Sequence, residues 1–235
     1  MDIKTTSKKT RDSLQLGIYR VINPFVRLLI KMGVTPNVVT TIGFLGNLAA
    51  AVVIVVAGYG AARTGIVDWS LVTWAGALII GFSLFDMLDG QVARIGGMAS
   101  TFGAMYDSVL DRYCELATIG GIAYYLIQTG NFAGAVIAFV ALTGSIMVSY
   151  VRARAEGLGL ECKIGFMQRP ERVVVTSVAT LATGITGQIS GYQPGAEGFN
   201  PDTILVVAMC VIAVFANLTA IARINHCRKL LGKSK

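Results

Sequence analysis

The chain has 235 residues, of which 54% are apolar and only 14% are charged. Soluble domains carry about 25% charged residues, so this composition excludes a typical soluble enzyme, a disordered chain and a coiled coil. It predicts an all-α polytopic membrane protein, and the few charges become informative because a charge at membrane depth is costly.

The first element is a polar, basic leader over residues 1–35. Its apolar residues recur at helical spacing, and Arg20, Arg27 and Lys31 fall on another face. This pattern predicts an amphipathic helix that lies in the cytoplasmic membrane interface, with a simple cytoplasmic helix as the alternative. The apolar positions are Leu14, Ile18, Val21, Ile22, Phe25, Leu28 and Leu29.

Residues 36–235 are predicted to form one membrane domain with six spanning helices. The apolar stretches lie at about 38–58, 69–93, 105–128, 131–151, 172–189 and 203–224, and each is near the roughly 20 residues that a span needs. An even number of spans places both termini on one side, and 19 of the 20 Lys and Arg residues fall there, with Arg63 as the exception. Because cytoplasmic loops are rich in Lys and Arg, we expect a cell (inner or plasma) membrane protein with both termini in the cytoplasm.

Four carboxylates flank the turn between the second and third predicted spans. Asp86 and Asp89 are three residues apart, and Asp107 and Asp111 are four apart, so each pair occupies one helix face. If the two helices form a hairpin, the faces converge and the four charges repel. Carboxylate oxygens suit hard cations, so we expect one or two divalent ions there rather than zinc. The alternative is that these acids are ion-paired structural groups or helix caps.

Small residues surround the acids, and Arg94 ends the second span beside them. Small residues let a ligand or a neighbouring backbone approach closely. A metal pair with a nearby arginine is a plausible pyrophosphate clamp. The small positions are Gly90, Ala93, Gly96, Gly97, Gly103 and Ala104.

The run from Asp86 to Asp111 resembles the signature of the CDP-alcohol phosphotransferases. That pattern is D-x2-D-G-x2-A-R-x8-G-x3-D-x3-D, and every fixed position is matched here. The resemblance extends over nearly the whole chain, because that family has six spans, an N-terminal interfacial helix and a similar Thr35-Pro36-Asn37 entry to the first span.

The resemblance implies transfer of a phosphatidyl-type group from a CDP-linked lipid, such as CDP-diacylglycerol, to an alcohol, with release of CMP. It implies a two-metal site of Mg²⁺ or Mn²⁺ held by Asp86, Asp89, Asp107 and Asp111, with Asp111 also acting as the general base. The CDP contacts carried over are Gly90, Ala93 and Arg94, with Ser100 and Thr101 as possible helpers. A homodimer is implied by the family alone, and no nucleic-acid partner is expected.

Arginines near the cytoplasmic ends of the last three spans suggest the acceptor. Several basic groups that converge from separate helices make an anion site, which a phosphorylated acceptor needs and a neutral alcohol does not. The alternative is that each arginine reaches to the lipid headgroups. The segment Ser149–Gly157, followed by Arg169-Pro170-Glu171-Arg172, resembles prokaryotic phosphatidylinositol phosphate synthases and their archaeal relatives. Carried over by position, the inositol phosphate contacts are Ser149, Arg152, Arg172 and Arg223, with Arg154 as a helper.

Two alternatives stay open from the residues. Glycerol 3-phosphate is also anionic, so the chain could make phosphatidylglycerophosphate instead. Carboxylates at membrane depth could also serve a divalent-cation transporter. Release of CMP from a CDP-linked lipid separates the transferases from the transporter.

Overall fold

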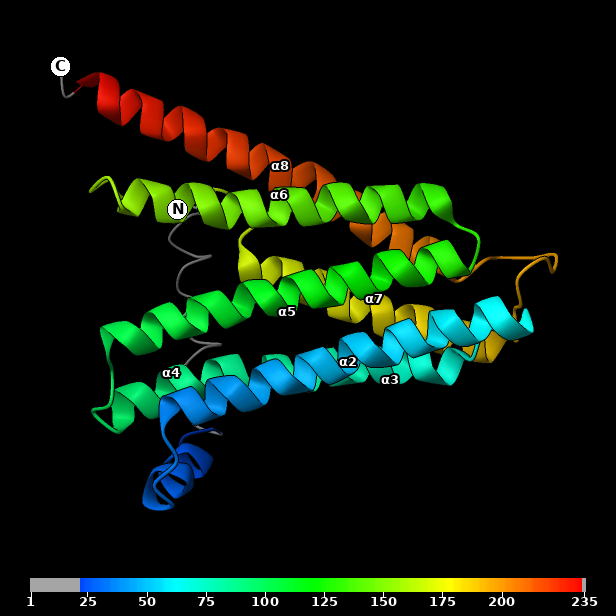
Figure 1. The fold of residues 1–235 in the computed structure, drawn as a ribbon, viewed down its shortest axis with the longest axis horizontal. Coiled ribbons are helices and arrows are strands. Elements are labelled where there is room, and N and C mark those ends of the chain that lie inside the picture. The colour runs from blue at the N-terminus through cyan, green and yellow to red at the C-terminus, as the bar shows by residue number, and fades with distance from the viewer. Residues whose placement is uncertain (1–21, 234–235) are drawn as a thin grey trace, which may run out of the picture. The chain divides into compact units, whose positions relative to one another are not determined.

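The computed structural model describes residues 22–233, and every regular element among them is a helix. Residues 22–31 form a first helix, and the prediction of an amphipathic segment over residues 1–21 lies outside the described part. The remaining helices, in chain order, are α2 (Pro36–Thr64), α3 (Trp69–Ser83), α4 (Phe85–Ile95), α5 (Thr101–Gln128), α6 (Phe132–Glu156), α7 (Arg169–Ser190) and α8 (Asp202–Lys233) (Figure 1).

The internal contacts divide the chain into two compact units. The first unit holds residues up to Gly43 together with Leu84–Leu110, and so contains the helix 22–31, the start of α2, α4 and the start of α5. The second unit holds Phe44–Ser83 and everything from Asp111 onward. Helices α2 and α5 each pass from one unit into the other.

The second unit is a helical bundle in which α3 packs on α7, while α8 packs on α6 and α7. Glycines allow the close approach of α3 and α7. A Cβ atom added at Gly184 would lie 2.3 Å from the backbone nitrogen of Thr73, and one added at Gly76 would lie 2.4 Å from the backbone nitrogen of Leu181. Small residues at helix contacts are typical of membrane bundles.

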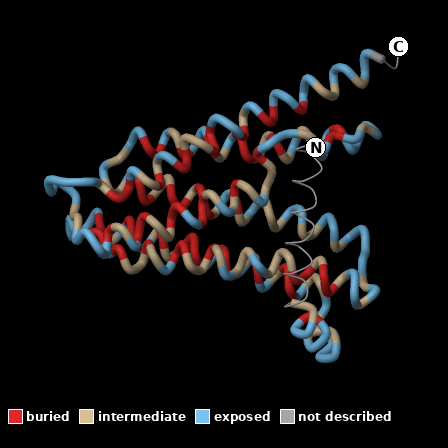
Figure 2. Tube along the Cα trace, turned by 180° about the vertical axis from the view of Figure 1, so that it is seen from behind, coloured by how far each residue is buried: buried red, intermediate tan, exposed pale blue. Residues whose placement is uncertain are grey.

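Helix α7 carries its polar residues inside and its apolar residues outside. Thr176, Thr180 and Thr183 are buried, whereas Ile189 is 83% exposed. Figure 2 shows that buried and exposed positions alternate along the helices of this unit. A soluble bundle would have the opposite arrangement, so the outward apolar face indicates a lipid environment.

Five helices in the described residues are long and apolar enough to cross a membrane. The chain is therefore a multi-pass membrane protein, but the predicted count of six spans stays a prediction. Helix α5 has 28 residues, yet four charged side chains interrupt it, namely Asp107, Asp111, Arg112 and Glu115. The predicted span 69–93 lies within one of these five spans, Trp69–Ile95, which is interrupted at Leu84 between α3 and α4.

The first unit has a small apolar core of its own. Val26 of the helix 22–31 packs with Val39 of α2 and with Leu88 and Val92 of α4. This helix ends at a turn in which Gly33 adopts a φ of 75°, a left-handed conformation that glycine reaches without strain. On its other side Phe25, Leu28 and Met32 are exposed, so an interfacial position for the helix stays a prediction.

Candidate active site

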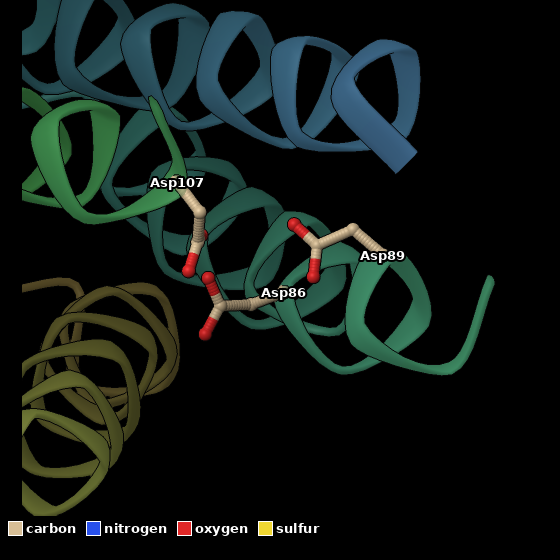
Figure 3. A group of neighbouring side chains, drawn as sticks. All are labelled: Asp86, Asp89 and Asp107. Atoms are coloured by element: carbon tan, nitrogen blue, oxygen red, sulfur yellow. The ribbon is translucent and has the colours of Figure 1, made fainter. Parts of the chain in front are cut away.

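Three of the four predicted carboxylates lie together in the first unit. One ligand oxygen from each of Asp86, Asp89 and Asp107 lies within 4.8 Å of the other two. The side chains come from α4 and α5 and point toward a common centre (Figure 3). Asp89 is buried, with 6% of its surface exposed. An all-oxygen, all-anionic donor set at this spacing fits a hard divalent cation such as Mg²⁺ or Mn²⁺.

Local helix geometry accounts for this cluster. Asp86 and Asp89 are separated by one helical turn on α4, and Asp86 lies in the first turn, where the helix dipole favours an anion. Thr40 of α2 donates a hydrogen bond to Asp89 Oδ2 at 2.7 Å. Because Thr40 Oγ1 also lies 3.0 Å from the carbonyl oxygen of Pro36, its position is set by its own helix.

A cleft adjoins the carboxylates in the same unit. Its cavity volume is about 260 Å³, slightly below the roughly 300–1,000 Å³ of small-molecule sites. Asp89 and Asp107 line it, and so do four of the five predicted donor contacts, namely Gly90, Ala93, Arg94 and Ser100. Thr101, the fifth, is not among the lining residues. Pro36, Asn37 and Thr40 form the opposite wall from the start of α2.

Asp111 belongs to the second unit, four positions after Asp107 on α5. Its described partners are arginines. Arg169 Nη2 of α7 lies 2.5 Å from Asp111 Oδ1, and Arg112 Nη1 lies 3.5 Å from Oδ2. The predicted union of Asp111 with the other three carboxylates in one metal site stays a prediction.

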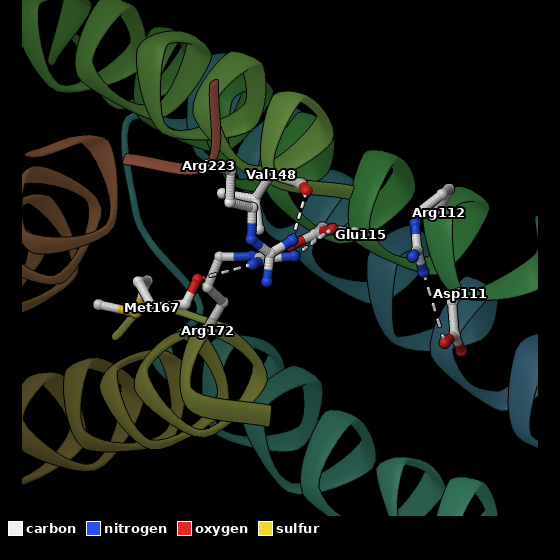
Figure 4. A network of polar contacts seen from close by, with 7 residues as sticks. All are labelled: Asp111, Arg112, Glu115, Val148, Met167, Arg172 and Arg223. Carbon is white, nitrogen blue, oxygen red and sulfur yellow. Dashed lines mark hydrogen bonds and ion pairs between the residues drawn. The ribbon is translucent and has the colours of Figure 1, made fainter. Parts of the chain in front are cut away.

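One turn further along α5, Glu115 forms a buried ion pair with Arg172 of α7 (Figure 4). Arg172 Nε donates to Glu115 Oε1 at 2.5 Å, and Nη2 donates to Oε2 at 3.1 Å. Arg172 Nη1 donates to the carbonyl oxygen of Met167 at 3.2 Å. The two side chains are 1% and 6% exposed.

A polar cavity in the second unit brings these two ion pairs together. Its acidic and basic lining residues are Asp111, Glu115, Arg169 and Arg172. Neutral polar groups from α2, α3, α5 and α7 also line it, namely Asn47, Ser83, Thr118 and Thr176. Ile79, Cys114, Ile119 and Val173 complete the wall, and the cavity volume is about 30 Å³. Four charged side chains around one cavity inside a membrane bundle are costly, which marks the cavity as a functional-site candidate.

The other predicted acceptor contacts lie at different depths. Arg223 is 2% exposed, and it donates from Nε to the Ile164 carbonyl at 2.8 Å and from Nη1 to the Val148 carbonyl at 2.6 Å. Its charge is within electrostatic range of both Arg172 and Arg152. Arg223 of α8 is therefore within electrostatic range of two other predicted arginines, one from α6 and one from α7.

Arg152 is half-exposed and pairs with Glu156 one turn later, at 2.9 Å. Arg154 is exposed and Ser149 is partly buried. Of the five predicted acceptor contacts only Arg172 lines the polar cavity.

Sequence reasoning gave no role to Glu115 or Thr40. Glu115 lies one turn after Asp111 and could have been noticed as a third acid on that helix face. Thr40 is a lone hydroxyl in an apolar run, and no sequence signal connects it with Asp89.

Comparison with known proteins agrees with these features. The chain matches a phosphatidylinositol phosphate synthase of Cutibacterium acnes with 31% identity, over 93% of this chain and 97% of that protein. A protein of the same name from Streptomyces avermitilis is 33% identical over 89% of this chain and 79% of its own length.

Solved structures are similar as well. The Mycobacterium tuberculosis phosphatidylinositol phosphate synthase with CDP-DAG bound is 28% identical, with a TM-score of 0.71, and covers 88% of this chain and 94% of that one. The structure of that synthase in complex with manganese and citrate has a TM-score of 0.69 at 28% identity and covers 87% of each chain.

The fold and the carboxylate cluster define a multi-pass membrane protein with a candidate divalent-metal site. The family described as CDP-alcohol phosphatidyltransferase matches residues 33–214. The chain belongs to this family and is an enzyme of that transferase type.

Proposed function

We propose that this enzyme transfers the phosphatidyl group of CDP-diacylglycerol to a hydroxyl of inositol phosphate. The products are phosphatidylinositol phosphate and CMP. The observation that carries the proposal is the Asp86, Asp89 and Asp107 cluster beside a cleft that four of the five predicted donor contacts line. It occurs in a chain that phosphatidylinositol phosphate synthases match over most of their length.

The donor is assigned to the cleft of the first unit. Gly90 and Ala93 leave room for the CDP part, and Arg94 and Ser100 offer donors to its phosphates. Thr101 follows Ser100 at the start of α5 and remains in the proposed donor set. Asp86, Asp89, Asp107 and Asp111 would hold two ions, Mg²⁺ or Mn²⁺. Such ions neutralise the pyrophosphate and stabilise the charge on the departing CMP.

Asp111 is the proposed general base. The acceptor hydroxyl oxygen bonds to the phosphorus that bears the diacylglycerol, and the bond from that phosphorus to the bridging oxygen breaks. CMP leaves with the electron pair, and the hydroxyl proton passes to the Asp111 carboxylate. The ion pair with Arg169 orients this carboxylate before the acceptor arrives.

The acceptor phosphate is assigned to the arginine group of the second unit. Arg152, Arg172 and Arg223 converge from three helices, with Ser149 and Arg154 at the edge of the group. Guanidinium groups bind phosphate through paired N–H donors. Arg172 and Arg152 already pair with Glu115 and Glu156, and Arg223 donates to backbone carbonyls. A phosphorylated acceptor would add an anion to this basic group, which a neutral alcohol would not, and this favours the phosphorylated acceptor.

A competition between acceptors tests the proposal. Purified protein with CDP-diacylglycerol and Mg²⁺ is offered inositol phosphate, glycerol 3-phosphate, inositol or serine, and the released CMP is measured. We expect the highest kcat/KM with inositol phosphate, by at least about tenfold. Preference for glycerol 3-phosphate would make the enzyme a phosphatidylglycerophosphate synthase, and metal flux without CMP release would indicate a transporter.

We also propose that residues 1–35 form the interfacial segment, that residues 36–235 form the membrane domain, and that the enzyme is a homodimer. Both termini and the site are proposed to face the cytoplasm. The excess of Lys and Arg on one side of the predicted spans supports the orientation. Cysteine labelling of single-cysteine variants from each side of sealed vesicles tests it.

A further inference from the structure

We infer that Glu115 is a positioning residue for the acceptor site: its carboxylate holds the Arg172 guanidinium in one orientation for the acceptor phosphate. The inference rests on the proposed function, because it assumes that the acceptor carries a phosphate. Glu115 itself is not required to touch either substrate.

The hydrogen-bond count of Arg172 supports this role. A guanidinium has five N–H donors. Glu115 takes one from Nε and one from Nη2, and the Met167 carbonyl takes one from Nη1. One N–H is left on each terminal nitrogen, and these donors are available to the oxygens of a phosphate.

The place of the pair distinguishes it from a bond that merely joins two helices. Both Glu115 and Arg172 line the polar cavity that also contains Asp111, the proposed base. Asp111 and Glu115 are one turn apart on α5, and Arg169 and Arg172 are three residues apart on α7. Each acid therefore fixes a different arginine, Asp111 holding Arg169 and Glu115 holding Arg172.

Charge balance gives a second reason for a carboxylate at this position. Arg172 is 1% exposed and lies within electrostatic range of Arg223. Two buried guanidinium groups repel one another and would turn apart without a counter-charge. Glu115 opposes that repulsion before the acceptor arrives, so less ordering is needed when the phosphate binds.

The first test is Glu115→Gln in the full-length protein in detergent. The amide keeps the shape of the side chain but offers one acceptor oxygen and no charge. We expect the KM for inositol phosphate to rise at least tenfold, with kcat and the KM for CDP-diacylglycerol within threefold of wild type. An unchanged KM for inositol phosphate overturns the inference, and so does an equal rise in both KM values.

The second test exchanges the charges, with Glu115→Arg and Arg172→Glu in one protein. The exchange restores an ion pair between α5 and α7, so we expect the melting temperature to recover toward wild type. The acceptor KM stays raised because α7 no longer carries the guanidinium, and its return to wild type would overturn the inference. If the exchanged protein does not fold, the KM comparison in Glu115→Gln decides.

Tyr125→Phe is the matched control. It removes a buried hydrogen bond of the same helix, from Tyr125 to Asp202 at 2.8 Å, away from the polar cavity. We expect a lower melting temperature with an unchanged acceptor KM, and a raised acceptor KM in this variant would overturn the specific role of Glu115. Absence of inositol phosphate-dependent CMP release in wild type contradicts the proposed function, whereas wild-type activity with an unchanged Glu115→Gln contradicts only this inference.

Discussion

Asp111 has the most demanding role of any residue in the proposed reaction, because it accepts the proton of the attacking hydroxyl. We expect Asp111→Asn to lower kcat by at least about 100-fold, within the 10² to 10⁴ range of a general base. Binding of CDP-diacylglycerol, measured by calorimetry, should remain largely intact. Loss of donor binding would contradict the assignment, and Asp68→Asn in the exposed loop before α3 is the control.

Thr40 acts on Asp89 from a different helix. Thr40→Val keeps the shape of the side chain but removes the 2.7 Å hydrogen bond to the carboxylate. Groups that orient a metal-binding carboxylate contribute about 10- to 100-fold to metal affinity. We expect Mn²⁺ binding, followed by electron paramagnetic resonance, to weaken by about tenfold. Thr40→Ser retains the hydroxyl and should bind Mn²⁺ like wild type, and equal affinity in Thr40→Val would refute the role.

Residues that pair along one helix could be predicted from the sequence, whereas residues that pair between helices could not. Asp86 and Asp89 share a face of α4 because one helical turn separates them, and a local period is readable from spacing. The partners of Thr40 and Glu115 lie 49 and 57 residues away. Those contacts depend on how whole helices pack, which the spacing of residues along the chain does not encode.

Among the elements, α3 and α7 form the contact most sensitive to side-chain size. A side chain at Gly184 would meet backbone atoms of Thr73, which cannot move without shifting α3. Inserting bulk into a packed contact costs about 1–3 kcal/mol. We expect Gly184→Val to lower the melting temperature in detergent. Gly120→Ala, where a Cβ meets open space, should be neutral or slightly stabilising, and equal stability of both variants would contradict the packing argument.

Apolar composition predicted most of the helices but missed the boundary between α3 and α4. The predicted span 69–93 is continuous in hydropathy, whereas the structure has α3 ending at Ser83 and α4 beginning at Phe85. Average hydropathy measures affinity for lipid and carries no information about a local change in the backbone. The break matters because it separates the apolar α3 from the short helix that carries Asp86 and Asp89.

For the whole molecule, metal should be required for both catalysis and full stability. Three carboxylates within 4.8 Å repel one another without a counter-ion. We expect EDTA to abolish CMP release and to lower the melting temperature, because a ligand that binds only the folded state stabilises it. Adding Mg²⁺ or Mn²⁺ back should restore both. Full activity after exhaustive chelation would remove the metal from the proposal.

The inward threonines and arginines of α7 also bear on how the protein is made. Helix α7 is the least apolar of the five candidate spans, and Arg172 alone in lipid would be costly to insert. Helix α5, which carries Glu115, precedes α7 in the chain and leaves the ribosome first. If α5 spans the membrane as the sequence predicts, α7 enters a membrane that already holds its counter-charge. The order of the two helices along the gene helps a helix with a weak insertion signal to become a stable span.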